Sequence, residues 1–481
     1  MKSQPVETQK EQLERILHTA RNTAMGKKYT FTNIVDAKTY RARVSLTDYD
    51  SIKYDIEKMR LGAPDVLCKG VVKKYSKSSG TTSDRSKYIP MPNECHYGNH
   101  VAASWDTMAL VYNENPSAKI FEKKSVIMGG SISTNNGVST GDISALLLKH
   151  MHWAGRPFFT PDFATALLDD WEVKINRMAE QCAKQSIEMI GGVPTWTLVL
   201  CDAILKATGK NDMSEIWPTA RFYMHGGVGF DPYRKQFDEL FPIKGFKYYE
   251  VYNASEGYFA VQDESTAEGM LLLLSNNIYY EFIPVEEVNA SDPIAVELAD
   301  VQEGQIYALV ITTASGLYRY VIGDLVQIVS TNPYRIKVAG RTKQYINTFG
   351  EEVMVANTDA AVAKTCAQLN CSVSEYSVAP IHMARDTKGA HLWVVEFEEG
   401  PADIGVFAEA LDAQLRKLNS DYDAKRQHDL AMQCLQVRAV PRGTFHKWLR
   451  SKGKIGGQNK VPRLSTDMKY INELLKVADY V

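Results

Sequence analysis

The stretch KYYEVYNASEGYFAV, residues 247–261, carries aromatic and aliphatic side chains over the length of a strand and then meets small residues. Three other runs share this pattern: KSVIMGGSIS (124–133), ARFYMHGGVGF (220–230) and MLLLLSNNIYYEFIPV (270–285). Runs of this kind are typical of strands that end at functional loops. Helical periodicity dominates at about 6–29, 99–112 and 163–208, the last interrupted at GGVPTW (191–196). The sequence therefore predicts a mixed α/β core.

The chain divides into a large and a small predicted domain. GQIYALVITTASGLYRYVIGDLVQIVS (304–330) reads as two or three strands that close the large domain. Beyond it we expect a helix near 357–368, two strands flanking a turn at 386–389, a helix near 403–418 and a strand near 434–440. This order is typical of a small α+β lid domain. We expect domains at 1–340 and 341–481, with a hinge near 340–345.

Composition indicates a globular protein with a small-molecule partner. The 481 residues are 44% hydrophobic, and 55 basic against 57 acidic residues give a net charge of -2, which disfavours attraction to nucleic acid or to a membrane surface. The seven cysteines are scattered without paired spacing, so neither a disulfide framework nor a zinc site is expected. The polar, acid-containing N-terminus lacks the apolar core of a secretory signal. We expect a cytoplasmic protein.

One loop is rich in hydroxyl groups. KSSGTTSDRSKYIP (77–90) places Ser78, Ser79, Thr81 and Thr82 around Gly80, and Lys87 follows. Small residues with hydroxyl and backbone donors let a polyanion approach closely, and a lysine adds a charge for phosphate oxygens. The loop matches neither the Walker pattern nor the dinucleotide glycine pattern. On its own, it is either a phosphate loop or a polar surface turn.

Two acidic residues follow strand-like runs. Glu256 lies in a turn of small residues in VYNASEGYFAVQDE and is either a ligand of a metal ion or a solvated loop acid. Asp324 follows Gly323 between two apolar segments in GLYRYVIGDLVQI and is either a ligand-binding carboxylate or an aspartate that bonds to its own turn.

Taken together and in order, these motifs resemble those of a known family. Ser-Ser-Gly-Thr-Thr (78–82), Tyr-x-x-Ser-Glu-Gly (252–257) and Tyr-Arg-Tyr-x-x-Gly-Asp (318–324) resemble the three nucleotide motifs of the adenylate-forming enzymes. More narrowly, they are similar to the motifs of the auxin-responsive acyl-acid amido synthetase family, the Gretchen Hagen family. Three further stretches resemble the bacterial branch of this family: GVPTWTLVL, HGGVGFDPYR and GGQNKVPRL. The resemblance runs from about residue 10 to the C-terminus.

The resemblance implies a ligase with a large adenylation domain and a mobile C-terminal domain. Such enzymes activate a carboxylic acid with ATP and Mg²⁺, release pyrophosphate and leave an acyl-adenylate. An amine, usually an amino acid, then attacks the adenylate to give an amide. Because a carboxylate attacking a phosphate brings two negative groups together, the protein must supply donors and cations.

The resemblance also assigns residues. Glu256 would hold Mg²⁺, Asp324 would bind the ribose, and Lys460, delivered by a mobile loop, would reach the α-phosphate and the attacking carboxylate. The full ATP-binding set is Ser78, Ser79, Gly80, Thr81, Thr82, Lys87, Gly226, Gly227, Tyr252, Asn253, Ser255, Asp324, Arg341 and Lys343. The acyl-substrate candidates are His225, Trp196 and Tyr112. The alternative for His225 is a structural histidine whose hydrogen bonds are satisfied, and the alternative for Trp196 and Tyr112 is core packing.

The chain departs from the wider superfamily at two positions. Val228 follows the glycine pair where an acid is common, and Asn347 follows Ile346 where a lysine is common. Three alternatives remain. The protein is an acyl-CoA ligase, which shares the first half-reaction, or an inactive nucleotide-binding module. The third alternative is a nucleic-acid-binding protein, and it rests on the six basic residues between Lys447 and Arg463.

Overall fold

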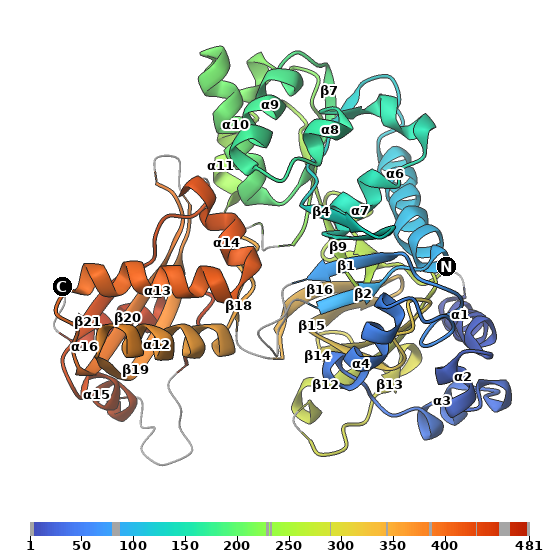
Figure 1. The fold of residues 1–481 in the computed structure, drawn as a ribbon. Coiled ribbons are helices and arrows are strands. Elements are labelled where there is room, and N and C mark those ends of the chain that lie inside the picture. Colours follow the sequence, from blue (N-terminus) through green and yellow to red (C-terminus); the bar gives the residue numbers. More distant parts are fainter. Residues whose placement is uncertain are drawn as a thin grey trace.

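A computed structural model of the chain has a larger N-terminal part, which ends with β16 (Tyr334–Arg341), and a smaller C-terminal part, which begins with β17 (Tyr345–Ile346) (Figure 1). The structure describes residues 4–78, 87–227, 230, 233–288, 290–342, 345–383, 387–429, 431–451 and 462–478. No helix among these residues has the length and apolar character needed to cross a membrane.

One large sheet organises the N-terminal part. Within the described residues its strands run in the order β13-β12-β14-β15-β16-β11-β10-β9-β8-β7-β3-β6. The pairs from β6 to β9 are parallel, and the pairs from β9 to β13 are antiparallel. The bounds are β3 (Lys124–Val126), β6 (Phe159–Thr160), β7 (Ile187–Gly192), β8 (Phe222–His225), β9 (Lys247–Ala254), β10 (Gly257–Val261), β11 (Met270–Leu272), β12 (Ile278–Pro284), β13 (Val296–Glu297), β14 (Ile306–Thr313) and β15 (Tyr320–Thr331).

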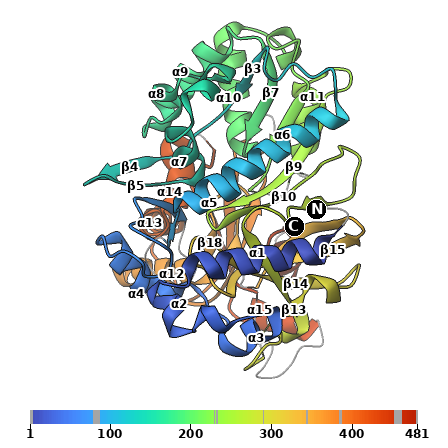
Figure 2. The ribbon, with the colours of Figure 1, turned by 90° about the vertical axis from the view of Figure 1, so that its right-hand side faces the viewer.

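Helices cover the large sheet. The described helices of this part are α1 (Pro5–Ala20), α2 (Ala24–Lys28), α3 (Ala37–Arg43), α4 (Tyr49–Arg60), α5 (Asn93–Cys95), α6 (Ala102–Glu114), α7 (Ile143–Lys149), α8 (Phe163–Ala166), α9 (Trp171–Cys182), α10 (Pro194–Thr208) and α11 (Arg234–Leu240). Figure 2 shows α1 and α6 running across the same face of the molecule. Helix α1 buries Leu13, Ile16, Leu17 and Ala20, whose helical spacing forms one apolar stripe toward β12.

The strand β7 corrects the expectation of helical structure throughout 163–208. Those residues form α8, α9 and α10 with β7 between the last two. Residues 187–190 are all buried between β3 and β8, and a parallel strand covered on both faces reads as a continuous run rather than as an alternating one. Helix α10 starts with Pro194 in its first turn and ends at Gly209 in the left-handed conformation.

A smaller sheet presents the hydroxyl loop. Its order is β2 (Lys87–Pro90), β1 (Lys74–Ser78), β5 (Val138–Gly141) and β4 (Ile132–Asn135). Strands β1 and β2 pair antiparallel, with Ser78 opposite Lys87. The intervening residues 79–86 lie outside the described residues, so Lys87 marks the point at which the loop returns to the sheet.

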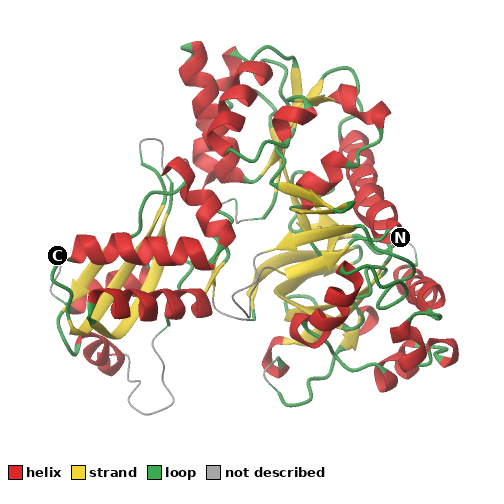
Figure 3. Cartoon of the chain, in the orientation of Figure 1, coloured by secondary structure: helices red, strands yellow, loops and turns green. Residues whose placement is uncertain are grey.

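The C-terminal part is a three-stranded sheet between two layers of helices (Figure 3). Strand β20 (Ala390–Glu399) pairs antiparallel with β19 (Ser372–Ile381) and parallel with β21 (Gln436–Val440). Its residues alternate: Trp393 and Val395 pack with the helices α12 (Val355–Leu369) and α13 (Ile404–Leu418), whereas Leu392 and Val394 pack with α15 (Thr444–Ser451) and α16 (Lys469–Val477). Helix α14 (Ser420–Arg426) and strand β18 (Val353–Met354) face the N-terminal part.

A buried ion pair holds the start of β15. Arg319 precedes the strand with a positive φ of 46°, and its Nε lies 3.1 Å from Glu281 Oε2 on β12 while its Nη1 donates to the Val44 carbonyl at 2.9 Å. Both side chains are buried. Arg319 is the arginine of the Tyr-Arg-Tyr-x-x-Gly-Asp motif, so this pair fixes the strand that carries Asp324.

We expect Glu281→Gln to destabilise the N-terminal part by about 3–5 kcal/mol, because removing one member of a buried ion pair leaves the other charge uncompensated. Urea unfolding followed by fluorescence measures this change. Glu286→Gln, which alters an exposed carboxylate close by in the sequence, is the matched control. Equal unfolding midpoints for the two variants would contradict the role of the pair.

Candidate active site

Two adjoining cavities lie where strands of the large sheet end. The larger, here called the strand-end cleft, has a volume of about 420 Å³ and is lined from the ends of β7, β8 and β9 by Val193, Gly227 and residues 250–256. Ligands of open α/β sheets bind outside the carboxyl ends of parallel strands. The smaller, the tryptophan cavity, has a volume of about 240 Å³ and walls that include Met128, Trp171 and Trp196.

Glu256 lies in the two-residue turn between β9 and β10 and lines the strand-end cleft. Its side chain is only 6% exposed, and burial raises the pKa of its carboxyl, an effect that the nearby Lys87 ammonium partly opposes. Apart from the Glu256 backbone itself, no described residue forms a hydrogen bond or ion pair with this carboxylate. Gly257 leaves room for the Ile278 side chain, because a side-chain carbon at Gly257 would lie 2.8 Å from Ile278 Cδ1. The turn therefore holds a buried carboxylate that faces a cavity.

Asp324 is held from both sides on β15. The Tyr252 hydroxyl on β9 donates to Asp324 Oδ2, and the Arg341 guanidinium lies 2.6 Å from Asp324 Oδ1. Asp324 and Arg341 are register partners on β15 and β16, so the sheet itself sets this contact. Arg341 also reaches Glu352, at 3.3 Å. All four residues line the strand-end cleft.

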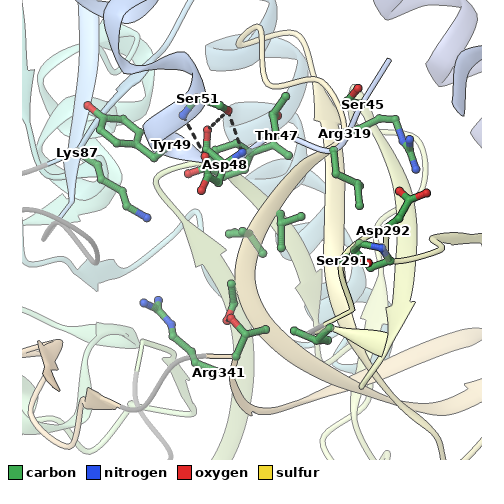
Figure 4. Close-up of a pocket in the computed structure, with 18 of the residues that line it drawn as sticks. Ser45, Thr47, Asp48, Tyr49, Ser51, Lys87, Ser291, Asp292, Arg319 and Arg341 are labelled. Atoms are coloured by element: carbon green, nitrogen blue, oxygen red, sulfur yellow. Dashed lines mark hydrogen bonds between the residues drawn. The ribbon is translucent and has the colours of Figure 1, made fainter. Parts of the chain in front are cut away.

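A third cleft meets the strand-end cleft at Lys87 and Arg341. It has a volume of about 680 Å³ and is lined from α4, β2 and β15. Figure 4 shows the ammonium of Lys87 and the guanidinium of Arg341 directed toward the same side of this cleft. Behind them, Asp48 and Ser51 form the capping box of α4, with the Ser51 amide 3.0 Å from Asp48 Oδ1. The two cations therefore face both clefts.

The other expected ATP-binding residues either lie at or near the strand-end cleft or lie outside the described residues. Gly227, Asn253 and Ser255 line the strand-end cleft, and Ser255 Oγ lies 2.8 Å from Ser76 Oγ on β1. Gly226 precedes Gly227, and a side-chain carbon on it would lie 2.4 Å from the Val251 carbonyl. The backbone of Ser78 ends β1. The remaining candidates lie outside the described residues, namely Ser79, Gly80, Thr81, Thr82, Lys343 and Lys460.

The three acyl candidates lie in different environments. Trp196 lines the tryptophan cavity, and its ring stacks on Trp171 with centroids 3.9 Å apart. His225 is 4% exposed and stacks on Phe230, and burial lowers its pKa to about 3, so the imidazole is neutral. Tyr112 is 40% exposed and lines neither of these two cavities, because α6 buries its other side through Ala103, Thr107 and Val111.

Sequence reasoning missed several lining residues. Lys77, Asp142, Asp421 and Lys425 line both the strand-end cleft and the tryptophan cavity. Lys77 opens the quoted hydroxyl loop but was not singled out, the other three belong to no recognisable motif, and Lys425 lies in a charged helical segment whose sequence is typical of a solvated helix. Asn347, noted for its departure from the superfamily, donates to the Gly227 carbonyl at 3.0 Å and so joins the two parts of the chain.

Solved structures share this fold. The chain resembles the acyl acid amido synthetase AtGH3.15 in complex with 2,4-DB, with a TM-score of 0.62, 18% identity, and coverage of 99% of this chain and 94% of that one. It also resembles a 2-hydroxyisobutyryl-CoA ligase in complex with 2-HIB-AMP and CoA, with a TM-score of 0.59, 15% identity, and coverage of 97% and 91%. These likenesses confirm the predicted α/β class, with a large N-terminal and a smaller C-terminal domain.

The chain is also similar in sequence to plant amido synthetases. The Arabidopsis thaliana indole-3-acetic acid-amido synthetase GH3.3 is 22% identical over 541 residues, which cover 95% of this chain and 88% of the relative. A probable indole-3-acetic acid-amido synthetase of Oryza sativa subsp. japonica, GH3.11, is 30% identical over 241 residues, which cover 44% and 40%.

Family matches extend along most of the chain. Residues 1–175 and 131–245 match the GH3 family N-terminal domain, residues 271–341 its central domain, and residues 356–469 its C-terminal domain. The N-terminal matches alone span more than half of the 481 residues. The chain therefore belongs to the GH3 family, in agreement with the resemblance carried by its three nucleotide motifs.

Proposed function

We propose that this protein activates a carboxylic acid with ATP as an acyl-adenylate and transfers the acyl group to an amine, an amino acid, to form an amide. The observation that carries this proposal is the buried Glu256 carboxylate beside Lys87, in a cleft that opens into a cavity with a tryptophan wall. Among the described residues, no other residue forms a hydrogen bond or ion pair with this carboxylate. Family membership and the names of the relatives support the same reaction.

ATP fits the strand-end cleft in one orientation. Asp324 accepts hydrogen bonds from the ribose hydroxyls, and Arg341 lies beside the ribose. The Gly226-Gly227 turn lies next to the base. The loop after β1 and Lys87 then meet the phosphates, because Lys87 stands opposite Ser78 where that loop returns to the sheet. Backbone and hydroxyl donors together with a lysine suit a polyphosphate.

Mg²⁺ fits the donor set at Glu256. The ion prefers oxygen ligands and is commonly held by one or two carboxylates together with substrate phosphates. A buried carboxylate without a partner among the described residues supplies such a ligand, and burial has already removed its water. When bound, Mg²⁺ supplies positive charge that offsets the phosphate charge.

The reaction proceeds through two displacements. A carboxylate oxygen of the acid forms a bond to the α-phosphorus, and the bond from that phosphorus to the bridging oxygen breaks, so pyrophosphate leaves with the electron pair. The amine nitrogen then bonds to the acyl carbon, the bond from that carbon to the phosphate oxygen breaks, AMP leaves, and the nitrogen loses a proton to solvent.

Lys460 serves the first displacement by neutralising charge at the α-phosphate. In this proposal the C-terminal domain, residues 341–481, carries Lys460 to the α-phosphate by pivoting near 340–345. The same domain withdraws the lysine for the second displacement. Between β16 and β17 the chain passes from one part to the other, and Asn347 lies against Gly227 just beyond this point.

The experiment that tests the proposal is ATP–pyrophosphate exchange with Mg²⁺ across aryl, indole and fatty acids, followed by mass spectrometry of products formed with amino acids or coenzyme A. Acid-dependent exchange and an amide product are the expected results. A thioester with coenzyme A would favour the ligase alternative, for which the fold shared with a CoA ligase gives a reason. ATP binding without exchange would contradict the proposal.

Glu256→Gln should lower exchange at least about a hundredfold, because it removes a preorganised charge contact at the reacting phosphates. The fold should be no less stable, because an unpaired buried carboxylate opposes folding. Burial raises the pKa of Glu256 in the folded state, so its destabilising charge is absent below the ordinary pKa of about 4.3 and grows as pH rises through the folded value.

The stability advantage of Glu256→Gln should therefore be larger at pH 7 than at pH 4. Exchange assays and thermal melts at both pH values, with Glu286→Gln as the control, measure the two effects. Full activity in Glu256→Gln would exclude the carboxylate from the reaction.

Lys460→Ala should slow adenylate formation at least about a hundredfold, the scale of losing one transition-state charge contact. Lys469→Ala, an exposed lysine on α16, is the matched control and should retain the wild-type rate. Unchanged pyrophosphate exchange in Lys460→Ala would remove this lysine from the mechanism.

A further inference from the structure

Two lysines enclose a pair of stacked indole rings at the edge of the active site. Lys174 Nζ lies 4.2 Å from the Trp171 ring centroid, Trp171 stacks on Trp196 with centroids 3.9 Å apart, and Lys425 Nζ lies 4.9 Å from the Trp196 centroid. Lys174 belongs to α9, whereas Lys425 comes from α14 of the C-terminal part. Cations over the faces of tryptophan rings are attracted by them, so this stack joins the two parts.

Lys425 lies at the junction of the two cavities. It lines both the strand-end cleft and the tryptophan cavity. Gly350, with a φ of +84°, leaves room for it, because a side-chain carbon there would lie 3.4 Å from Nζ. Burial lowers its pKa, and within the described residues no carboxylate forms an ion pair with its ammonium. Its charge is therefore available to a ligand at the junction.

Three ammonium groups lie around Asp142 at the junction. Asp142 accepts a hydrogen bond from the Ser131 amide at 2.7 Å, and Lys425, Lys77 and Lys174 all lie near enough to lower its pKa against the effect of burial. Two of these lysines belong to the N-terminal part, and Lys425 comes from the C-terminal part. These cations would attract the carboxylate of a ligand that enters the junction.

Three further carboxylates face Lys425 from the C-terminal part: Asp421, Glu351 and Glu352. Glu351 accepts the Phe349 amide at 2.6 Å and contacts His391 Nε2 at 2.8 Å. Glu352 contacts Arg341. These two carboxylates are therefore already paired with other donors.

We propose that Lys425 binds the carboxylate of the acid substrate during its activation, a role that rests on the proposed function. A carboxylate that reaches the α-phosphate from the tryptophan cavity must pass through the junction, where the ammonium offsets the repulsion between the two anions. The lysine arrives with α14, so the C-terminal part completes the acid site. Because Trp171 and Lys425 cover the two faces of Trp196, the acyl group packs against indole edges and Met128 rather than on a ring face.

The test is steady-state exchange with Lys425→Met, which keeps a long apolar stem and loses the charge. The probe acid is whichever of benzoate, indole-3-acetate and hexanoate gives the highest exchange with the wild-type protein. The KM for the acid should rise at least tenfold, while the KM for ATP changes less than twofold. Lys425→Arg should recover part of the affinity for the acid. Lys417→Met, on the exposed side of the neighbouring helix α13, is the matched control.

Lys425→Gln repeats the test if Lys425→Met melts at a lower temperature than the wild type. An unchanged KM for the acid in these variants would overturn the inference while the proposed function stands. Normal exchange with impaired amide formation would also overturn it, because the lysine would then act on the acceptor. A wild-type protein without acid-dependent exchange would refute the proposed function and this inference together.

Discussion

The contact between the Asp324 carboxylate, the Tyr252 hydroxyl and the Arg341 guanidinium joins the features on which the active site depends. Three strands meet there, since β9 supplies the tyrosine, β15 the aspartate and β16 the arginine. Burying a carboxylate costs less when donors pair with it, and the two donors fix the position of Asp324. The same tyrosine begins the motif that ends in Glu256, and the same arginine closes the last strand before the C-terminal part. The network therefore connects the turn that carries Glu256 with the last strand before the C-terminal part.

The change from parallel to antiparallel pairing at β9 explains why this network lies beside a cavity. On the parallel side, β7, β8 and β9 end together and leave Val193, Gly227 and the Ser255-Glu256 turn at one edge. On the antiparallel side, β15 and β16 bring Asp324 and Arg341 to the same place by register. The C-terminal part adds Asn347 and Lys425 from outside the sheet. The site thus combines side chains held by one sheet with side chains supplied by the smaller part.

A feature could be predicted when neighbouring residues in the sequence determine it. The period of the side chains and the chemistry of the turns predict the strands that end in small residues and the order of elements in the C-terminal part. The structure has β8, β9, α12, α13 and β21 close to where the sequence predicts them. Strand β7 was missed because a short apolar run between two helices has no period that separates strand from helix. Tyr112 lies outside the two cavities, and a helical stripe alone does not say which side of the helix is buried. Lys425 and Asp142 carry no sequence signal, since only the fold brings them together.

The central claim, that the acid is activated as an adenylate, is tested most directly by following its oxygen atoms. An acid labelled with ¹⁸O in its carboxylate, incubated with ATP, Mg²⁺ and an amino acid, should give AMP that carries one ¹⁸O and an amide that retains the other. This result follows because the bond that forms joins a carboxylate oxygen to the α-phosphorus, and the bond that breaks on transfer joins that oxygen to the acyl carbon. Unlabelled AMP, or ADP with labelled phosphate, would contradict the account.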